Sequence, residues 1–415
     1  MVNNGESNGP DPTSMDYPTR PDVSIFEAGS DVGAEPGPWR AIWRPGDEPG
    51  WRKFVEVGDL KLELGEVLPD VVVCYETYGA LNAQRSNAVL VEHGFTADTH
   101  AAGPAMPGHP ESGWWDGIVG PGKAIDTNRF FVVVPNALGG CQGTTSPGQL
   151  APDGRPWGSR WPVTTIRDLV SAEVALADEL GIDDWFAIVG TSMGAMRALE
   201  WAVGHPERLH RAVIIGVGPQ ATAEQIALQT IQISSIVEDP EFLGGDYYGD
   251  EPFLGRGPLR GMAQARRLGH VTYRSEMELH QRFGNTSQVG EHGLDPERRG
   301  RYAVMSYLDH AARRLERRFD ANTYVALNEA MNHHDIGRDR GGWRDAMKRI
   351  SATLTIVGME EDRLYPLRLQ KALAAEARRL NGNPVPLEIV RSIVGHDAFL
   401  TEDDKMAAVI RPALA

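Results

Sequence analysis

A serine set between two glycines is the first feature of this sequence that could do chemistry. Gly190-Thr191-Ser192-Met193-Gly194 matches the pattern G-x-S-x-G. The apolar run at 185–189 precedes it and is typical of a buried strand, and apolar residues recur at helical spacing after it. Strand, tight turn and helix form the context of a nucleophile elbow, in which flanking glycines give the strained turn room. We therefore predict that Ser192 is a nucleophile.

A serine hydroxyl needs a base within reach and a group that orients the base. Asp362 and His396 each follow a predicted strand, and with Ser192 they give the chain order Ser, acid, His of α/β-hydrolases. Active sites gather at the carboxyl ends of the strands in such sheets. We predict that His396 is the general base and then the acid, and that Asp362 holds its imidazole and stabilises the imidazolium.

Three other carboxylates near these positions are alternatives for the orienting acid. Asp397 is adjacent to His396 and would have to reach back to the ring of its own neighbour. Glu360 and Glu361 are closer to the preceding strand and are more typical of solvated turn carboxylates. This comparison favours Asp362.

Acyl chemistry at a serine also needs two N–H donors for the developing oxyanion. The backbone amide of Met193, directly after the nucleophile, is the first candidate. The second is the amide of Phe95, in the loop His93-Gly94-Phe95-Thr96 that follows an earlier apolar strand.

The elements that must position these residues alternate between strand and helix along most of the chain. An alternating pattern from Phe54 to Leu64 predicts an edge hairpin, and continuous apolar runs predict strands at 71–75, 87–91, 131–134, 185–189, 212–215, 352–357 and near 387–390. Helices are predicted at 165–180, after the serine, and at 222–237, 259–268, 302–319, 324–331 and 366–380, with capping boxes at Thr165-Ile166-Arg167-Asp168 and at Thr222 with Gln225.

This alternation predicts an α/β-hydrolase fold with a mostly parallel, doubly wound central sheet. From about 219 to 349 only helical patterns occur, so we expect an inserted helical lid that covers the serine. The predicted organisation is a mobile N-terminal extension at 1–45, the first part of the core at 46–218, the lid at 219–349 and the second part of the core at 350–415.

Composition narrows the class of protein. The 415 residues include 41 Lys and Arg against 57 Asp and Glu, a net charge of −16, which argues against nucleic acid as a partner. Cys74 and Cys141 show neither a disulfide framework nor zinc-type spacing, so we expect two buried thiols in a cytoplasmic protein and no metal. We see no signal peptide and no apolar run long enough for a membrane span.

Several stretches of the sequence together form a specific pattern: 75–79 (Tyr-Glu-Thr-Tyr-Gly), 93–96 with Asp98, His100 and Gly103, 114–116, 120–127, 136–141, 165–168, 198–201, 362–366 and 395–400. Through these stretches, and over roughly residues 47–412, the sequence closely resembles the homoserine O-acetyltransferases of methionine biosynthesis.

The resemblance implies an acyltransferase of ping-pong mechanism, with acetyl-CoA as co-substrate and no permanently bound cofactor. An acetyl group would pass to Ser192 and then to the hydroxyl of homoserine. Arg266 matches a lid arginine that grips the substrate carboxylate, with Arg267 as an alternative. Tyr273 matches a lid tyrosine near the site, Asp397 matches the acid that contacts the substrate amine, and Thr96 is counted with the substrate-binding residues. A homodimer formed through the lid helices is also implied.

The sequence departs from the family pattern at a few positions. Thr191 and Ala195 stand where glycines are usual, Phe95 and Ala97 replace a usual Leu and Gly, and Glu361 replaces a small polar residue. The alternatives to a homoserine O-acetyltransferase are an enzyme of the same fold that uses succinyl-CoA as donor or serine as acceptor and, less favoured, an esterase or other hydrolase. A long lid favours transfer, because an enclosed site keeps water from the acyl-enzyme.

Overall fold

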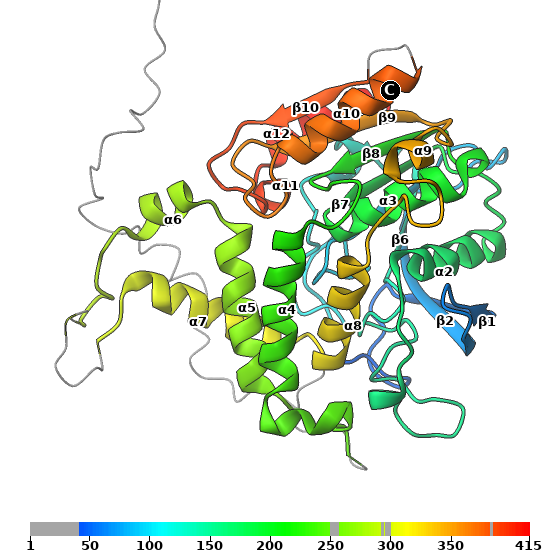
Figure 1. Cartoon of the computed structure of the whole chain (residues 1–415). Helices are drawn as coiled ribbons and strands as arrows, with labels where there is room; N and C mark the ends of the chain where they lie inside the picture. The colour runs from blue at the N-terminus through cyan, green and yellow to red at the C-terminus, as the bar shows by residue number, and fades with distance from the viewer. Residues whose placement is uncertain (1–40, 250–256, 292–293, 295–299, 382–384) are drawn as a thin grey trace, which may run out of the picture.

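A computed structural model describes residues 41–249, 257–291, 294, 300–381 and 385–415 (Figure 1). Within them a central sheet of eight strands has the order β1-β2-β6-β3-β7-β8-β9-β10. The strands are β1 Lys53–Lys61, β2 Val67–Tyr78, β3 Ala88–Glu92, β6 Phe131–Pro135, β7 Ala187–Thr191, β8 Arg211–Ile215, β9 Thr353–Met359 and β10 Leu387–Val390, and a separate short pair is formed by β4 Val119–Gly120 and β5 Ile125–Asp126.

The sheet is mostly parallel, as the sequence predicts. Neighbouring strands run parallel from β6 through β3, β7, β8 and β9 to β10. The continuous apolar run at 71–75 favours a strand of the parallel part, but this interpretation is wrong, because the run lies in β2, which pairs antiparallel with both β1 and β6. The connection from β1 to β2 is too short for a crossover, so only a hairpin is possible.

Both faces of the sheet are covered. Leu90 of β3 lies in one hydrophobic cluster, whereas its neighbours Val89 and Val91 lie in another. Successive side chains of a strand point to opposite faces, so the two clusters are the two layers of the core. The helices of the core are α2 Ile166–Glu179, α3 Met193–Gly204, α10 Arg368–Asn381, α11 Ala398–Thr401 and α12 Asp403–Ala413, with short 3₁₀ turns η1 Gly158–Arg160 and η2 Pro206–Arg208.

All the secondary-structure elements described between β8 and β9 are helices. This is the region in which the sequence predicts a helical lid. These elements are α4 Ala223–Val237, η3 Pro240–Gly245, α5 Leu259–Tyr273, α6 Glu276–Phe283, α7 Ala303–Glu316, α8 Ala321–Asn332 and α9 Trp343–Met347. Figure 1 shows α4 and α5 side by side at one flank of the core, with α7 extending from them. Helix α5 runs past the predicted end at Leu268, and α6 was not predicted.

Both predicted capping boxes form at the starts of their helices. The side chain of Thr165 accepts from the amide of Asp168 at the start of α2, and the Asp168 carboxylate accepts from the Thr165 amide. Thr222 and Gln225 make the same reciprocal pair at the start of α4. These bonds satisfy amides that a helix start leaves without partners.

The start of the described chain is packed on the core. Ala41 and Ile42 are buried, and the Trp43 amide donates to the carbonyl of Cys141 over 2.9 Å, although the sequence placed 41–45 in the extension. The rest of the predicted extension, residues 1–40, lies outside the described residues. Cys74 and Cys141 are both free and buried. Across the described ranges, no helix combines the length and the apolar character that a membrane span requires.

Candidate active site

Ser192 sits at the turn between β7 and α3 in a strained conformation. Its φ of 52° and ψ of −118° lie in a region that residues with a side chain rarely adopt. A Cβ added to Gly194 would lie 2.0 Å from the carbonyl oxygen of Glu92, and one added to Gly190 would lie 2.3 Å from that of Gly194. The two glycines of the motif are therefore required sterically, as the sequence predicts.

The structure brings the three predicted catalytic residues together. His396 Nε2 lies 2.8 Å from Ser192 Oγ, and His396 Nδ1 lies 2.6 Å from Asp362 Oδ2. The second carboxylate oxygen, Oδ1, accepts from the amides of Leu364 at 2.9 Å and Tyr365 at 2.7 Å. These bonds fix the carboxylate, which in turn orients the imidazole.

The electrostatics of the site suit a general base. Ser192, Asp362 and His396 are all buried. Burial alone would lower the pKa of His396, but the charge and hydrogen bond of Asp362, together with the charge of Asp397, raise that pKa above its usual value. The geometry thus favours an imidazolium once a proton has been taken from the serine.

The alternatives for the orienting acid are separated by their surroundings. Glu360 and Glu361 are exposed, whereas Asp362 is buried against the ring. Asp397 Oδ2 makes an ion pair with Arg274 Nε over 3.1 Å. Only Asp362 among the four carboxylates is hydrogen-bonded to the imidazole of His396.

The two predicted oxyanion donors lie on stretches that flank the serine. Met193 is the first residue of α3, so its amide has no partner within the helix. Phe95 follows β3, next to Gly94, where an added Cβ would lie 3.8 Å from Ser192 Cβ. The Phe95 ring packs edge-on against Tyr324, with centroids 4.6 Å apart.

A buried charged network that sequence reasoning missed lies beneath this stretch. Arg197 of α3 donates to the carbonyl of His93 at 2.9 Å and to Glu173 of α2 at 2.5 Å, and Trp201 donates to the same carboxylate at 2.9 Å. His93 Nε2 in turn accepts from the amide of Ala137 at 3.1 Å. The network fixes the chain just before Phe95. An arginine on the buried face of an apolar helix was the signal in the sequence.

Ser192 opens into a cavity of about 860 Å³ that also holds the predicted substrate-binding residues. Thr96, Arg266, Tyr273 and Asp397 line it. Arg266 Nη1 donates to Thr96 Oγ1 at 3.3 Å, and its guanidinium carbon lies 5.6 Å from the centroid of the Tyr273 ring.

The structure also separates the two neighbouring lid arginines. Arg267 does not line this cavity, and its Nε donates to Asp309 over 2.9 Å. A guanidinium and a carboxylate, from Arg266 and Asp397, therefore share the cavity with the nucleophile. Arg274, the partner of Asp397, is a further residue that sequence reasoning missed.

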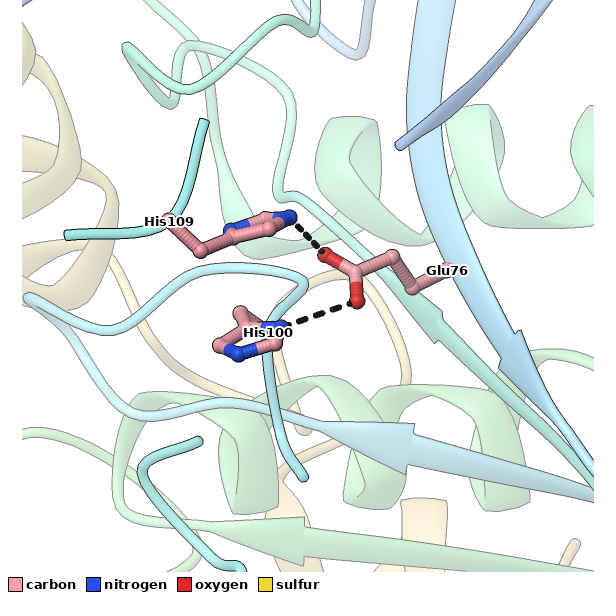
Figure 2. Close-up of side chains that lie close together, drawn as sticks. All are labelled: Glu76, His100 and His109. Carbon is pink, nitrogen blue, oxygen red and sulfur yellow. Dashed lines mark hydrogen bonds and ion pairs between the residues drawn. The ribbon is translucent and has the colours of Figure 1, made fainter. Parts of the chain in front are cut away.

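His100 and His109 line the cavity, and together with Glu76 they form a buried cluster (Figure 2). Figure 2 shows both rings directed at the Glu76 carboxylate, and the distances are 3.1 Å from His100 Nδ1 to Oε2 and 3.2 Å from His109 Nε2 to Oε1. Two imidazoles and a carboxylate are donors that a divalent cation accepts.

In this structure the cluster also satisfies its own polar groups. Glu76 accepts from Thr99 Oγ1 at 2.6 Å and from the Tyr78 hydroxyl at 2.9 Å, and His100 Nε2 lies 3.3 Å from the carbonyl of Pro104. The carboxylate and its partners tie the loop after Phe95 to strand β2.

Comparison with known proteins agrees with the fold. The family described as having an alpha/beta hydrolase fold matches residues 87–266. A homoserine O-acetyltransferase of Thermobifida fusca is 51% identical over 383 residues, which cover 92% of this chain and 98% of that protein.

Solved structures extend the comparison. A crystal structure of homoserine O-acetyltransferase from Bacillus anthracis, 27% identical, gives a TM-score of 0.79 over 88% of this chain and 97% of that chain. The crystal structure of esterase E22, 28% identical, gives a TM-score of 0.78 and covers 88% of this chain and 99% of that chain. The chain has the architecture of an enzyme of the α/β-hydrolase fold. Because it is 51% identical to a relative over nearly all of that protein, it belongs to the homoserine O-acetyltransferase family.

Proposed function

We propose that the protein transfers an acetyl group from acetyl-CoA to the hydroxyl of homoserine by way of an acyl-enzyme on Ser192. One observation carries the proposal: the bonded series Ser192, His396 and Asp362 opens into a cavity that also holds Arg266 and Asp397. The Thermobifida fusca relative, named homoserine O-acetyltransferase, supports it.

The first half-reaction uses the three bonded residues. His396 Nε2 takes the proton of Ser192 Oγ, which attacks the thioester carbon, and the negative oxygen formed is stabilised by the amides of Phe95 and Met193. When the carbon–sulfur bond breaks, the thiolate of coenzyme A takes the proton from His396. Asp362 remains ionised throughout and stabilises the imidazolium.

The second half-reaction reverses the roles with a new alcohol. The homoserine hydroxyl gives its proton to His396 and attacks the acyl carbon of the ester on Ser192. The bond to Ser192 Oγ then breaks, and Oγ recovers the proton from the imidazolium. Each step conserves protons, so the site returns to its initial state without a cofactor.

Two opposite charges in the cavity suit a zwitterionic acceptor. We assign Arg266 to the carboxylate of homoserine and Asp397 to its ammonium group, with Tyr273 and Thr96 beside them. Arg274 holds one oxygen of Asp397 and leaves the other for the substrate. An amino acid bound between these groups would present its side-chain hydroxyl to Ser192.

Hydrolysis is the second candidate, and the likeness to esterase E22 at a TM-score of 0.78 is the observation that favours it. In that reaction water replaces homoserine in the second half-reaction. The charged pair of Arg266 and Asp397 favours the amino acid, because a simple ester hydrolase has no need of two opposite charges beside its nucleophile.

The deciding assay follows coenzyme A release from acetyl-CoA or succinyl-CoA with homoserine, with serine and with neither. We expect release to be fastest with acetyl-CoA and homoserine and to yield the O-acetyl ester. Ser192→Ala should abolish release. Equal release with and without an amino acid would replace transfer by hydrolysis, and a preference for succinyl-CoA or serine would reassign the substrate.

We also propose a homodimer formed through the lid helices. Ile226, Ile231 and Val237 of α4 are exposed apolar side chains, which supports a partner on this helix. Sedimentation that gave a monomer would contradict the proposal.

We also propose a cytoplasmic location, which is supported by the free thiols of Cys74 and Cys141.

A further inference from the structure

The C-terminal end of lid helix α7 brings arginines to the same cavity that contains the nucleophile. Arg314, Arg317 and Arg318 all line it, together with Ser192. Arg314 and Arg317 are exposed, whereas Ser192 is buried, so these two arginines lie at the open end of the cavity and the serine at its closed end. The chain as a whole has a net charge of −16, so this group of arginines at the cavity entrance differs in sign from the overall charge of the protein.

The positive charge near the end of α7 affects a neighbouring histidine. The pKa of His310, one turn before Arg314 on α7, is lowered first by burial and then by the charges of Arg314, Arg313 and Arg317. A further positive charge is therefore disfavoured at this end of the helix. An anion approaching the cavity would meet a favourable potential there.

The two exposed arginines are available to a ligand. Arg314 pairs with Glu111 over 2.8 Å, but the two side chains are 58% and 45% exposed, and an ion pair so exposed contributes little. Arg317 makes no ion pair with any other residue in the described part of the chain. Arg318 differs, because its half-buried guanidinium faces the charges of Glu111 and Asp98.

Resting on the proposed function, we propose that Arg314 and Arg317 bind the phosphate groups of coenzyme A at the mouth of the cavity. Residues three apart on a helix lie on the same side, so both guanidinium groups can reach one ligand. Arginine matches phosphate oxygens with paired N–H donors, and the phosphate groups of coenzyme A together carry more charge than the Glu111 carboxylate they would displace. The pantetheine arm would then extend through the cavity, whose volume is about 860 Å³, to place the thioester at Ser192.

The test compares a donor that carries phosphates with one that does not. Initial rates with homoserine are measured for acetyl-CoA and for S-acetylpantetheine, with the native enzyme and with Arg314→Ala, Arg317→Ala and Arg313→Ala. Arg313 is the matched control, because it is an exposed arginine of the same helix that does not line the cavity. Thermal melting of each variant checks that the fold is retained.

We expect Arg314→Ala and Arg317→Ala each to raise the KM for acetyl-CoA by about tenfold, the effect of losing charge-assisted hydrogen bonds. The KM for S-acetylpantetheine should stay within about twofold, and Arg313→Ala should leave both values near those of the native enzyme. Added salt should raise the KM for acetyl-CoA and leave that for S-acetylpantetheine unchanged.

Three results would overturn the proposal: no rise in the KM for acetyl-CoA, an equal rise for both donors, or an equal effect of Arg313→Ala. None of these resembles a failure of the proposed function, in which the native enzyme itself would not transfer the acetyl group from either donor to homoserine.

Discussion

Replacing Asp362 by asparagine should disable the enzyme by turning the histidine to the wrong tautomer. Oδ1 of Asp362 accepts from two backbone amides, those of Leu364 and Tyr365, so the asparagine oxygen must take that place. The new NH₂ group then faces His396 Nδ1 where a carboxylate oxygen lay at 2.6 Å. A donor there makes Nδ1 the acceptor and puts the ring proton on Nε2. An Nε2 that carries a proton cannot take one from Ser192.

The expected loss of kcat in Asp362→Asn follows from the loss of the correct histidine tautomer. In serine triads a substitution that leaves the geometry intact but imposes this tautomer lowers kcat about 10⁴-fold. That factor corresponds to about 5 kcal/mol of activation free energy. The fold should be little affected, because asparagine keeps the two bonds to backbone amides and donates one to the histidine. We therefore expect Asp362→Asn to melt close to the native temperature.

The assay is coenzyme A release, followed both at steady state with homoserine and in a single turnover with acetyl-CoA alone. Both phases should slow by a similar factor, because the base is needed in each half-reaction. Glu361→Gln is the matched control: it removes a carboxylate from the adjacent position, but an exposed one. A loss of less than tenfold in folded Asp362→Asn, or an equal loss in Glu361→Gln, would refute the assignment of the acid.

Three further predictions concern the base, the acceptor and the elbow. Because the pKa of His396 is raised and only its neutral form accepts a proton, kcat/KM for acetyl-CoA should rise with pH, with a midpoint above about 6.5; a flat profile from pH 5 to 8 would contradict this. Arg266→Ala should raise the KM for homoserine about tenfold or more and leave that for acetyl-CoA nearly unchanged, whereas Arg267→Ala should change neither; equal effects of the two variants would remove the carboxylate role. Gly194→Ala places a Cβ 2.0 Å from the Glu92 carbonyl oxygen, so it should lower the free energy of unfolding by about 1–3 kcal/mol and abolish turnover, as checked by denaturant titration and activity.

The proximity of Ser192, Asp362 and His396 could be predicted from sequence because local patterns and one topological rule suffice. Ser192, Asp362 and His396 each follow an apolar run, and the carboxyl ends of parallel strands meet at one edge of a sheet. The antiparallel direction of β2 could not be predicted from its apolar run at 71–75, because such a run by itself does not distinguish a parallel strand from an antiparallel one. Helix α6 was missed because its eight residues, Glu276–Phe283, are largely polar and are fewer than the window over which helical periodicity can be recognised.

The supporting network could not be predicted for a different reason. Arg197 and the carbonyl it binds at His93 are 104 positions apart, and nothing local to either residue names the other. Such partners are chosen by the packing of α3 on the sheet. Arg266 and Tyr273 were identified from the family resemblance and not from their own pattern, which is that of ordinary helix residues.

The end of α5 is joined to the loop that carries the catalytic histidine. The amide of Ser275 donates to the carbonyl of Val394 at 3.0 Å, and the amide of Asp397 donates to the carbonyl of Tyr273 at 3.2 Å. Between them Gly395 adopts a φ of 92°, and a Cβ on it would lie 2.8 Å from the Ser275 amide nitrogen. The lid backbone and the histidine loop are thus in direct contact on both sides of His396.

This junction makes the lid part of the catalytic geometry. Arg266 lies about two turns before Tyr273 on the same helix, so the group assigned to the acceptor and the contact that fixes the histidine loop belong to one rigid element. A shift of α5 that moved Arg266 would also move His396 relative to Ser192. If homoserine binds Arg266 as proposed, an acceptor that holds α5 in place would also hold His396 beside the hydroxyl whose proton it takes. Water cannot contact Arg266, so we expect the proposed acceptor to react with the acyl-enzyme faster than water does.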